Sequence, residues 1–293
     1  MSQGEHGEGS KAPASFLCDY LGISRQGYYK HADRSLEVDV RRSSIVLYAR
    51  EVLKDMPKAG MRELHELCRR HFGQKFTIGR DQCYGIFRSN GLCRRNRKRP
   101  GTTYSNHNYF IYGNLLNTTP KLRPTGFGEL CVADITYVAT NTGWAYLSLV
   151  TDAASRAIVG WNLHPTPGKE GPIGALNMAL ECYRSYGIDP AGLIHHSDRG
   201  VQYCCNEYTA LLKASGIRIS MTQTGDPLHN ALAERMNNTV KNGWLFDTGD
   251  KAFEKVRALV AKAVELYNTV RPHQSLGMRT PRQELLRLID HAA

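Results

Sequence analysis

The chain has 293 residues, with 38 Lys and Arg against 27 Asp and Glu and a formal net charge of +11. This length suffices for a large core and predicts two or three domains. No segment approaches the run of about eighteen apolar residues that crosses a bilayer, and no signal peptide precedes the first predicted domain, so we expect a cytoplasmic protein.

The positive charge is concentrated in the first part of the chain. Residues 1–125 contain 22 Lys and Arg against 11 Asp and Glu, whereas residues 126–293 contain 16 of each. Basic halves of this kind also occur in ribosomal and membrane-surface proteins. Because a membrane span is disfavoured, the asymmetry indicates binding to DNA or RNA.

The N-terminal part predicts a tail followed by helices. Residues 1–14 are rich in Gly, Ser and Glu with almost nothing apolar, which predicts a disordered tail. Residues 15–100 predict a helical DNA-binding region. In it, apolar residues before a turn at Gly22 and a helix-capping Ser24 after the turn indicate a helix-turn-helix.

Three further stretches, residues 45–53, 61–68 and 77–87, show apolar residues at helical spacing. A basic run follows them and has no apolar face with which to pack. It contains Arg94, Arg95, Arg97, Lys98 and Arg99. These cations can neutralise DNA phosphates without reading sequence, although such a run can also be a solvated linker.

Residues 101–125 predict a linker that lies on DNA or on the protein itself, and residues 126–286 predict a catalytic core with a C-terminal helix. Strands are expected over residues 130–139, 144–151, 157–163 and 217–221 and before Asp198, and helices over residues 173–186, 207–214, 230–242 and 251–269. This order, βββαβαβα, is that of the ribonuclease-H-like fold, in the α+β or α/β class. It places the first strand beside the fourth.

Three carboxylates lie on separate predicted elements. Asp134 interrupts the apolar run CVADITYVAT, where a buried charge is costly unless it is compensated. Asp198 ends a predicted buried strand, and thirty-five residues separate it from Glu234 on a predicted helix. Alone, such an Asp is usually a turn former and such a Glu a solvated charge. Together they indicate divalent cations, two of which, about 4 Å apart, can clamp the attacking and leaving oxygens at phosphorus.

The motifs ADITYV, HSDRGVQY and AERMNNTVK, followed by YNTVRPHQSLGMRTP, resemble the retroviral-integrase-type core of OrfB transposases from two-reading-frame bacterial insertion sequences. The resemblance covers about residues 126–282 and extends more loosely to the N-terminal region. It implies that Asp134, Asp198 and Glu234 form the catalytic and metal-binding triad. One departure is His229, where many members have an Asp before the Asn.

The resemblance also implies a function and partners. A DNA transposase of this kind cleaves transposon ends and joins the 3′-OH to another phosphodiester with two Mg²⁺ ions, for which Mn²⁺ is expected to substitute. The implied partners are double-stranded DNA, further copies of the chain, and an upstream-frame DNA-binding protein or a frameshift fusion with it. The alternatives are a ribonuclease-H-like nuclease without strand joining and a catalytically inactive DNA-binding regulator.

Four side chains share the predicted helix face of Glu234 and are expected to contact DNA: Asn230, Asn237, Asn238 and Lys241. Lys241 lies two helical turns after the glutamate, where its ammonium can hold a phosphate beside the metal site. After the last predicted helix, Arg271 and His273 are expected either to contact DNA or to form a structural clasp.

A zinc site is not expected. The eight cysteines contain no Cys-x-x-Cys pair and are predicted to be reduced and buried, as in a cytoplasmic protein. His65, Cys68 and His71 share a helical face, as zinc ligands do, but are expected to form part of a packed helix. Related integrases carry a His-Cys zinc domain at the N-terminus, and this sequence departs from that pattern.

Two further features near the predicted site have ordinary structural explanations. Asp152 is expected to cap the turn after its strand rather than to bind metal. The adjacent His195 and His196 are expected to be strand residues whose ring nitrogens are satisfied by protein partners.

Overall fold

The computed structural model describes residues 24–93, 108–117, 122–223, 231–245 and 247–291, together with Ser15, Cys18, Tyr20 and Gly22. The predicted N-terminal tail, the basic run at residues 94–99 and Asn230 lie outside the described residues. What the sequence indicates for them stays a prediction.

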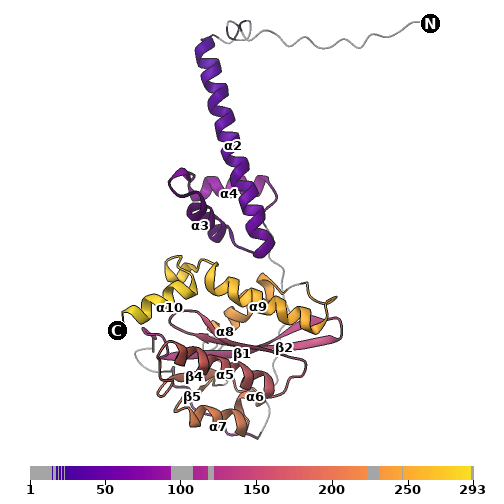
Figure 1. Ribbon diagram of the computed structural model, residues 1–293, viewed down its shortest axis with the longest axis vertical. Coiled ribbons are helices and arrows are strands. Elements are labelled where there is room, and N and C mark those ends of the chain that lie inside the picture. The colour runs from indigo at the N-terminus through magenta and orange to yellow at the C-terminus, as the bar shows by residue number, and fades with distance from the viewer. Residues whose placement is uncertain are drawn as a thin grey trace, which may run out of the picture.

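The N-terminal helical region consists of α2 (Arg25–Asp55), α3 (Met61–Phe72) and α4 (Arg80–Ser89), with a 3-10 turn, η1 (Gly73–Lys75), after α3. The three helices share a small core of buried side chains: Ile45, Ala49, Leu64, Cys68, Cys83 and Phe87. Figure 1 shows α2 projecting from the rest of the molecule as a long rod.

One expectation for this region is wrong. Ser24 does precede a helix, but residues 45–53 are the last part of that same helix, because α2 is continuous over 31 residues. Its sequence contains neither Gly nor Pro after Gly27, so no residue interrupts the helical backbone.

The core domain is built on a five-stranded sheet with the order β3-β2-β1-β4-β5. The strands are β1 (Leu130–Thr140), β2 (Gly143–Asp152), β3 (Ile158–His164), β4 (Ile194–Ser197) and β5 (Arg218–Met221). The first three form the expected antiparallel meander, and β4 and β5 add in parallel on the other side of β1. Gly143, at φ 123°, follows the tight turn between β1 and β2.

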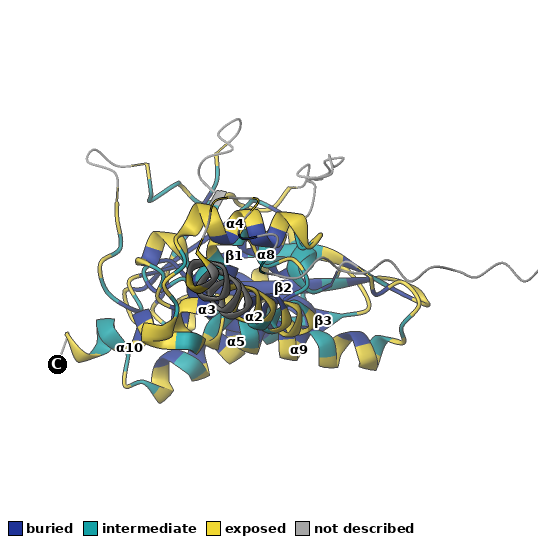
Figure 2. Ribbon diagram, turned by 90° about the horizontal axis from the view of Figure 1, so that it is seen from above, coloured by how far each residue is buried: buried dark blue, intermediate teal, exposed yellow. Residues whose placement is uncertain are grey.

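Helices cover both faces of this sheet (Figure 1). One face packs α5 (Glu170–Ser185), the short α6 (Val201–Cys204) and α7 (Asn206–Ala214), and the other packs α8 (Ala231–Gly243) and α9 (Phe253–Thr269). Side chains of β1 alternate between the two layers, since Cys131 and Ala133 join the α5 cluster and Val138 joins the α8 and α9 cluster. Figure 2 shows the buried residues along the strands and exposed residues on the outer helix faces.

Close packing explains a glycine in β3. A Cβ at Gly160 would lie 2.1 Å from the carbonyl oxygen of Ala175, so only glycine lets α5 approach the sheet this closely. The strand order and the helix layers together make the core a ribonuclease-H-like fold, as the sequence predicts, preceded by a helical region.

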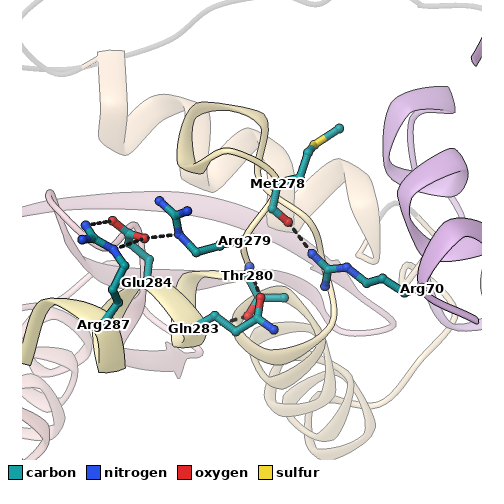
Figure 3. A network of polar contacts seen from close by, with 7 residues as sticks. All are labelled: Arg70, Met278, Arg279, Thr280, Gln283, Glu284 and Arg287. Carbon is teal, nitrogen blue, oxygen red and sulfur yellow. Dashed lines mark hydrogen bonds and ion pairs between the residues drawn. The ribbon is translucent and has the colours of Figure 1, made fainter. Parts of the chain in front are cut away.

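The last helix, α10 (Pro281–Asp290), was not anticipated as a separate element, although its sequence carries the signal. Thr280 caps it by accepting a hydrogen bond from the Gln283 backbone, and the Gln283 side chain accepts one from the Thr280 backbone (Figure 3). Glu284 in the same helix binds both Arg279 and Arg287.

The helical region contacts the core through side chains on both sides. Arg70 donates to the Met278 carbonyl at 2.5 Å (Figure 3). Arg271 forms an ion pair with Glu63 at 2.6 Å, and both side chains are at most 20% exposed. None of the helices described is long and apolar enough to cross a membrane.

Candidate active site

Asp134 lies near the middle of β1 on the face of the sheet that α8 covers. Its Oδ1 accepts a hydrogen bond from the Ile135 backbone at 2.9 Å, and its Oδ2 accepts one from Asn237 Nδ2 at 2.7 Å. The strand therefore fixes the backbone of the aspartate, and α8 fixes its carboxylate.

Asp198 is brought beside Asp134 by the parallel pairing of β1 and β4. The register places Ala133 opposite Ser197. Asp134 directly follows Ala133, and Asp198 directly follows Ser197. Asp198 Oδ1 accepts from the Gly200 backbone at 2.9 Å, which fixes the turn after β4. The aspartate therefore lies at the carboxyl end of a parallel strand, where sites in such sheets collect.

Glu234 lies in the first turn of α8 and is exposed. Its negative charge contributes to the raised pKa of Asp134. Burial raises the pKa of Asp134 to about 7, the negative charge of Asp198 adds to this, the hydrogen bonds from Asn237 and Ile135 oppose it, and the charge of Glu234 adds a smaller increase. The charges of Asp198, after β4, and of Glu234, on α8, therefore both act on Asp134 of β1.

The donor chemistry of this group fits a hard divalent cation. Its carboxylate oxygens are the ligands that Mg²⁺ prefers, and Asn237 adds a buried Oδ1 without a hydrogen-bond partner in the described part of the chain. The three carboxylates are not close enough together to form a complete metal site: in the described ranges, no three His, Cys, Asp or Glu side chains converge in a way that could hold a metal. Hydrogen bonds hold the carboxylates of Asp134 and Asp198, and Glu234 lies on a separate helix, α8.

The other residues expected around Glu234 lie in different environments. Lys241 Nζ is 3.5 Å from Thr136 Oγ1 and 5.9 Å from the centroid of the Tyr137 ring, so it sits against β1 two residues beyond Asp134. Asn238 is exposed. Asn237 is buried against Asp134, so its position suits holding the aspartate rather than touching DNA.

Arg271 and His273 lie where α9 ends. Arg271 is paired with Glu63 of α3, which is the clasp that the sequence left open as an alternative to DNA contact. Burial, together with the charges of Arg271, Arg156 and Arg235, lowers the pKa of His273 to about 4, so its ring is neutral at physiological pH. A DNA contact by either residue stays a prediction.

Asp152 caps the turn after β2, as expected. Its Oδ1 accepts from the Ser155 backbone at 2.8 Å and from Ser155 Oγ at 2.6 Å, and its Oδ2 accepts from the Gly128 backbone at 3.1 Å. In each of the adjacent histidines of β4, one ring nitrogen has a protein hydrogen-bond partner, so the expectation is confirmed for that nitrogen only. His195 Nε2 contacts Tyr208 OH at 2.9 Å, and His196 Nδ1 contacts Ser220 Oγ at 2.8 Å.

The face of α3 shared by His65, Cys68 and His71 is a packing surface. His65 Nε2 lies 3.2 Å from the Ile78 carbonyl oxygen, and the ring of His71 stacks on Tyr48 at 3.9 Å. Burial is the main cause that raises the pKa of Cys68 to about 12, which opposes thiolate formation. All eight cysteines are free.

Tyr203 near the aspartates was missed at the level of sequence. Its hydroxyl is buried and has no hydrogen-bond partner among the described residues. Burial and Tyr208 raise the pKa of Tyr203 well above its usual range, and the charges of Asp134 and Asp198 add to this. The residue lies five positions after Asp198 in the HSDRGVQY motif, so its place beside the site could have been inferred from that motif.

The sheet order and the paired aspartates define a ribonuclease-H-like core of the integrase type. Two models of the integrase core domain match the chain, over residues 124–227 and 215–281. Among solved structures, the HTLV-2 integrase catalytic core domain in complex with magnesium aligns at 17% identity with a TM-score of 0.43, covering 55% of this chain and 98% of that chain.

Similarity to curated proteins extends over most of the chain. It is 35% identical over 281 residues to the insertion element IS600 uncharacterized 31 kDa protein of Shigella sonnei, covering 90% of this chain and 96% of the relative. It is 30% identical over 275 residues to the transposase InsF for insertion sequence IS3A of Escherichia coli (strain K12), covering 91% and 92%. The chain therefore belongs to the family of insertion-sequence transposases with an integrase core domain.

Proposed function

We propose that this transposase binds the ends of its own insertion sequence, cleaves them and joins the resulting 3′-OH to target DNA at one site formed by Asp134, Asp198 and Glu234. The observation that carries the proposal is the register of β1 and β4, which sets two aspartates side by side under the helix that bears the glutamate. The effect of the Asp198 and Glu234 charges on Asp134 supports it, because such repulsion is relieved by a bound cation.

The three carboxylates would hold two Mg²⁺ ions, which supply Lewis-acid activation of the attacking water or 3′-OH and neutralise charge at the leaving oxygen. The chain's own residues hold this arrangement in place. Asn237 orients the carboxylate of Asp134, and the Gly200 backbone orients that of Asp198. Lys241, next to Thr136, would place its ammonium on a phosphate of the strand that is cut.

DNA binding is proposed for the helical region and for the basic run at residues 94–99, where the net positive charge of the chain is concentrated. Joining two ends to one target requires both ends to be held at once, so the protein is expected to act as an oligomer on DNA. A partner encoded by an upstream reading frame, or a fusion with it, belongs to the same proposal.

The test is incubation of the full chain with labelled DNA from the ends of the element and Mg²⁺ or Mn²⁺, with nicking and strand joining scored separately. Asp134→Asn, Asp198→Asn and Glu234→Gln should each abolish both reactions while DNA affinity is retained. Glu265→Gln, an exposed glutamate on α9, is the matched control. Near-normal turnover by any triad variant would contradict the assignment, and nicking without joining by the parent would favour the nuclease alternative.

A further inference from the structure

A cavity of about 210 Å³ lies between the helical region and α8. Lys58, in the connection from α2 to α3, lines one side of it. Asn238, Asn242 and Trp244 line the other side, together with Arg271 at the end of α9. Figure 1 shows the lower end of α2 close to the core domain.

The cavity is close to the proposed catalytic glutamate. Asn238 follows Glu234 by four residues on the exposed face of α8, and Asn242 follows by four more. One helical turn rises about 5.4 Å, so the cavity begins about one turn from Glu234. A DNA strand bound at the carboxylates therefore passes next to this opening.

The lining combines three chemical groups that suit one nucleotide. Lys58 is exposed and contributes a cation for a phosphate. Trp244 donates its indole N–H to the Asp55 carbonyl at 2.5 Å, which fixes the ring as an apolar wall. Asn242 donates to the Asn238 carbonyl at 2.6 Å, and this bond holds its amide, whose oxygen is an acceptor for a base edge, on the cavity side.

Two other charged side chains near the cavity take part in ion pairs. Arg271 is paired with Glu63 at 2.6 Å, and the Asp55 carboxylate is paired with Lys262 at 2.6 Å. Neither of these acidic side chains lines the cavity. The side chains that do line it are cationic, neutral polar, aromatic or aliphatic, and none is acidic, which favours a ligand with an anionic part and a flat apolar part.

We propose that this cavity binds an unpaired nucleotide of the DNA strand held at the catalytic site, with the base against Trp244 and the phosphate near Lys58. The inference rests on the proposed function, since it takes DNA to lie at Glu234. A cavity of about 210 Å³ has room for the base of a single nucleotide but not for a duplex. Binding here would hold open the end of the duplex while the strand is cut or joined.

The test uses the full chain without divalent metal, a dye-labelled oligothymidylate, a forked duplex with unpaired nucleotides and a blunt duplex. Trp244→Leu should weaken binding of the oligothymidylate and the forked duplex by about tenfold or more, because stacking on an aromatic ring is lost, and leave the blunt duplex unaffected. Trp144→Leu is the matched control, since Trp144 is 63% exposed at the start of β2.

Lys58→Ala provides a second readout should Trp244→Leu lower the melting temperature, with Lys54→Ala on the exposed surface of α2 as its control. We expect Lys58→Ala, and not Lys54→Ala, to weaken the forked duplex selectively. Equal affinities of the variants and their controls in a parent that binds and cleaves DNA would overturn the cavity proposal alone. A parent that neither binds nor cleaves DNA would instead overturn the proposed function and this inference with it.

Discussion

Two aspartates on neighbouring strands, the half-buried Asp134 in β1 and the fully buried Asp152 in β2, have the same side chain in different surroundings. Asp152 is fully buried and accepts from two backbone amides and a serine hydroxyl, with the Tyr183 hydroxyl at 3.4 Å. Burial raises its pKa and these donors oppose the increase, with no carboxylate contributing. The donors lessen the cost of burying this charge without cancelling it, since the pKa of Asp152 remains raised.

Asp134 has fewer donors and faces two other carboxylates. One backbone amide and Asn237 donate to it, while burial and the charges of Asp198 and Glu234 all raise its pKa. A fold under selection for stability alone would not place three acidic groups together. The comparison teaches that the capped aspartate stabilises the sheet and that the crowded one is retained for chemistry at some cost in stability.

The largest expected change in stability comes from removing the cap. Asp152→Ala should lower the free energy of unfolding by ~3–5 kcal/mol, because the buried backbone amide and hydroxyl of Ser155 and the part-buried amide of Gly128 lose their acceptor. Urea denaturation measures the change. Asp250→Ala, which removes an exposed partner of Lys251, should change stability by less than about 1 kcal/mol. Equal losses in the free energy of unfolding for Asp152→Ala and Asp250→Ala would contradict the stabilising role of Asp152.

On the side of the molecule that carries Asp134, a change of charge should alter chemistry without altering stability. Lys241→Ala is expected to reduce end cleavage by ~100-fold, because the scissile phosphate is no longer positioned, and to leave the melting temperature nearly unchanged. Lys255→Ala is the matched control, since Lys255 is exposed on α9. Parent-like cleavage by both Lys241→Ala and Lys255→Ala would make Lys241 an ordinary surface charge.

Removing the negative charge of Asp134 should change the free energy of unfolding by less than Asp152→Ala does, and in the opposite direction. Asp134→Asn should stabilise the metal-free protein on the order of 2 kcal/mol at pH 8. Because the folded-state pKa of Asp134 is raised to about 7 from 3.8, the parent loses stability as pH rises between these values. The advantage of the variant is therefore absent below about pH 4 and complete above about pH 7. Melting temperatures across this range test it, and a variant less stable than the parent at pH 8 would contradict the crowding.

Much of the core could be predicted because its signals are local. Alternating apolar residues mark β1 to β3, and the order of elements places the first strand beside the fourth, which brings Asp134 and Asp198 together. Asp152 as a turn cap follows from its position after a strand. The capping box at Thr280 is equally local, and it was available in the sequence although unused.

What could not be predicted depends on contacts between residues far apart in the chain. Asn237 bonds Asp134 across 103 positions, and Arg271 pairs with Glu63 across 208. Helical spacing places Asn237 on the same helix face as Glu234, but it does not predict which residue of another element Asn237 contacts. The depth at which His273 is buried, and with it the low pKa of its ring, is likewise set by packing that leaves no periodic pattern.

The most direct test of the central claim is metal binding measured as a shift in melting temperature, without any DNA. Saturating Mg²⁺ or Mn²⁺ should stabilise the parent by ~2–3 kcal/mol at about a hundred times the dissociation constant, which corresponds to roughly 5 °C or more. Asp134→Asn should abolish this shift, and Asp250→Ala should preserve it. The account predicts a metal-dependent rise that requires Asp134, and an equal rise in the parent and in Asp134→Asn would contradict it.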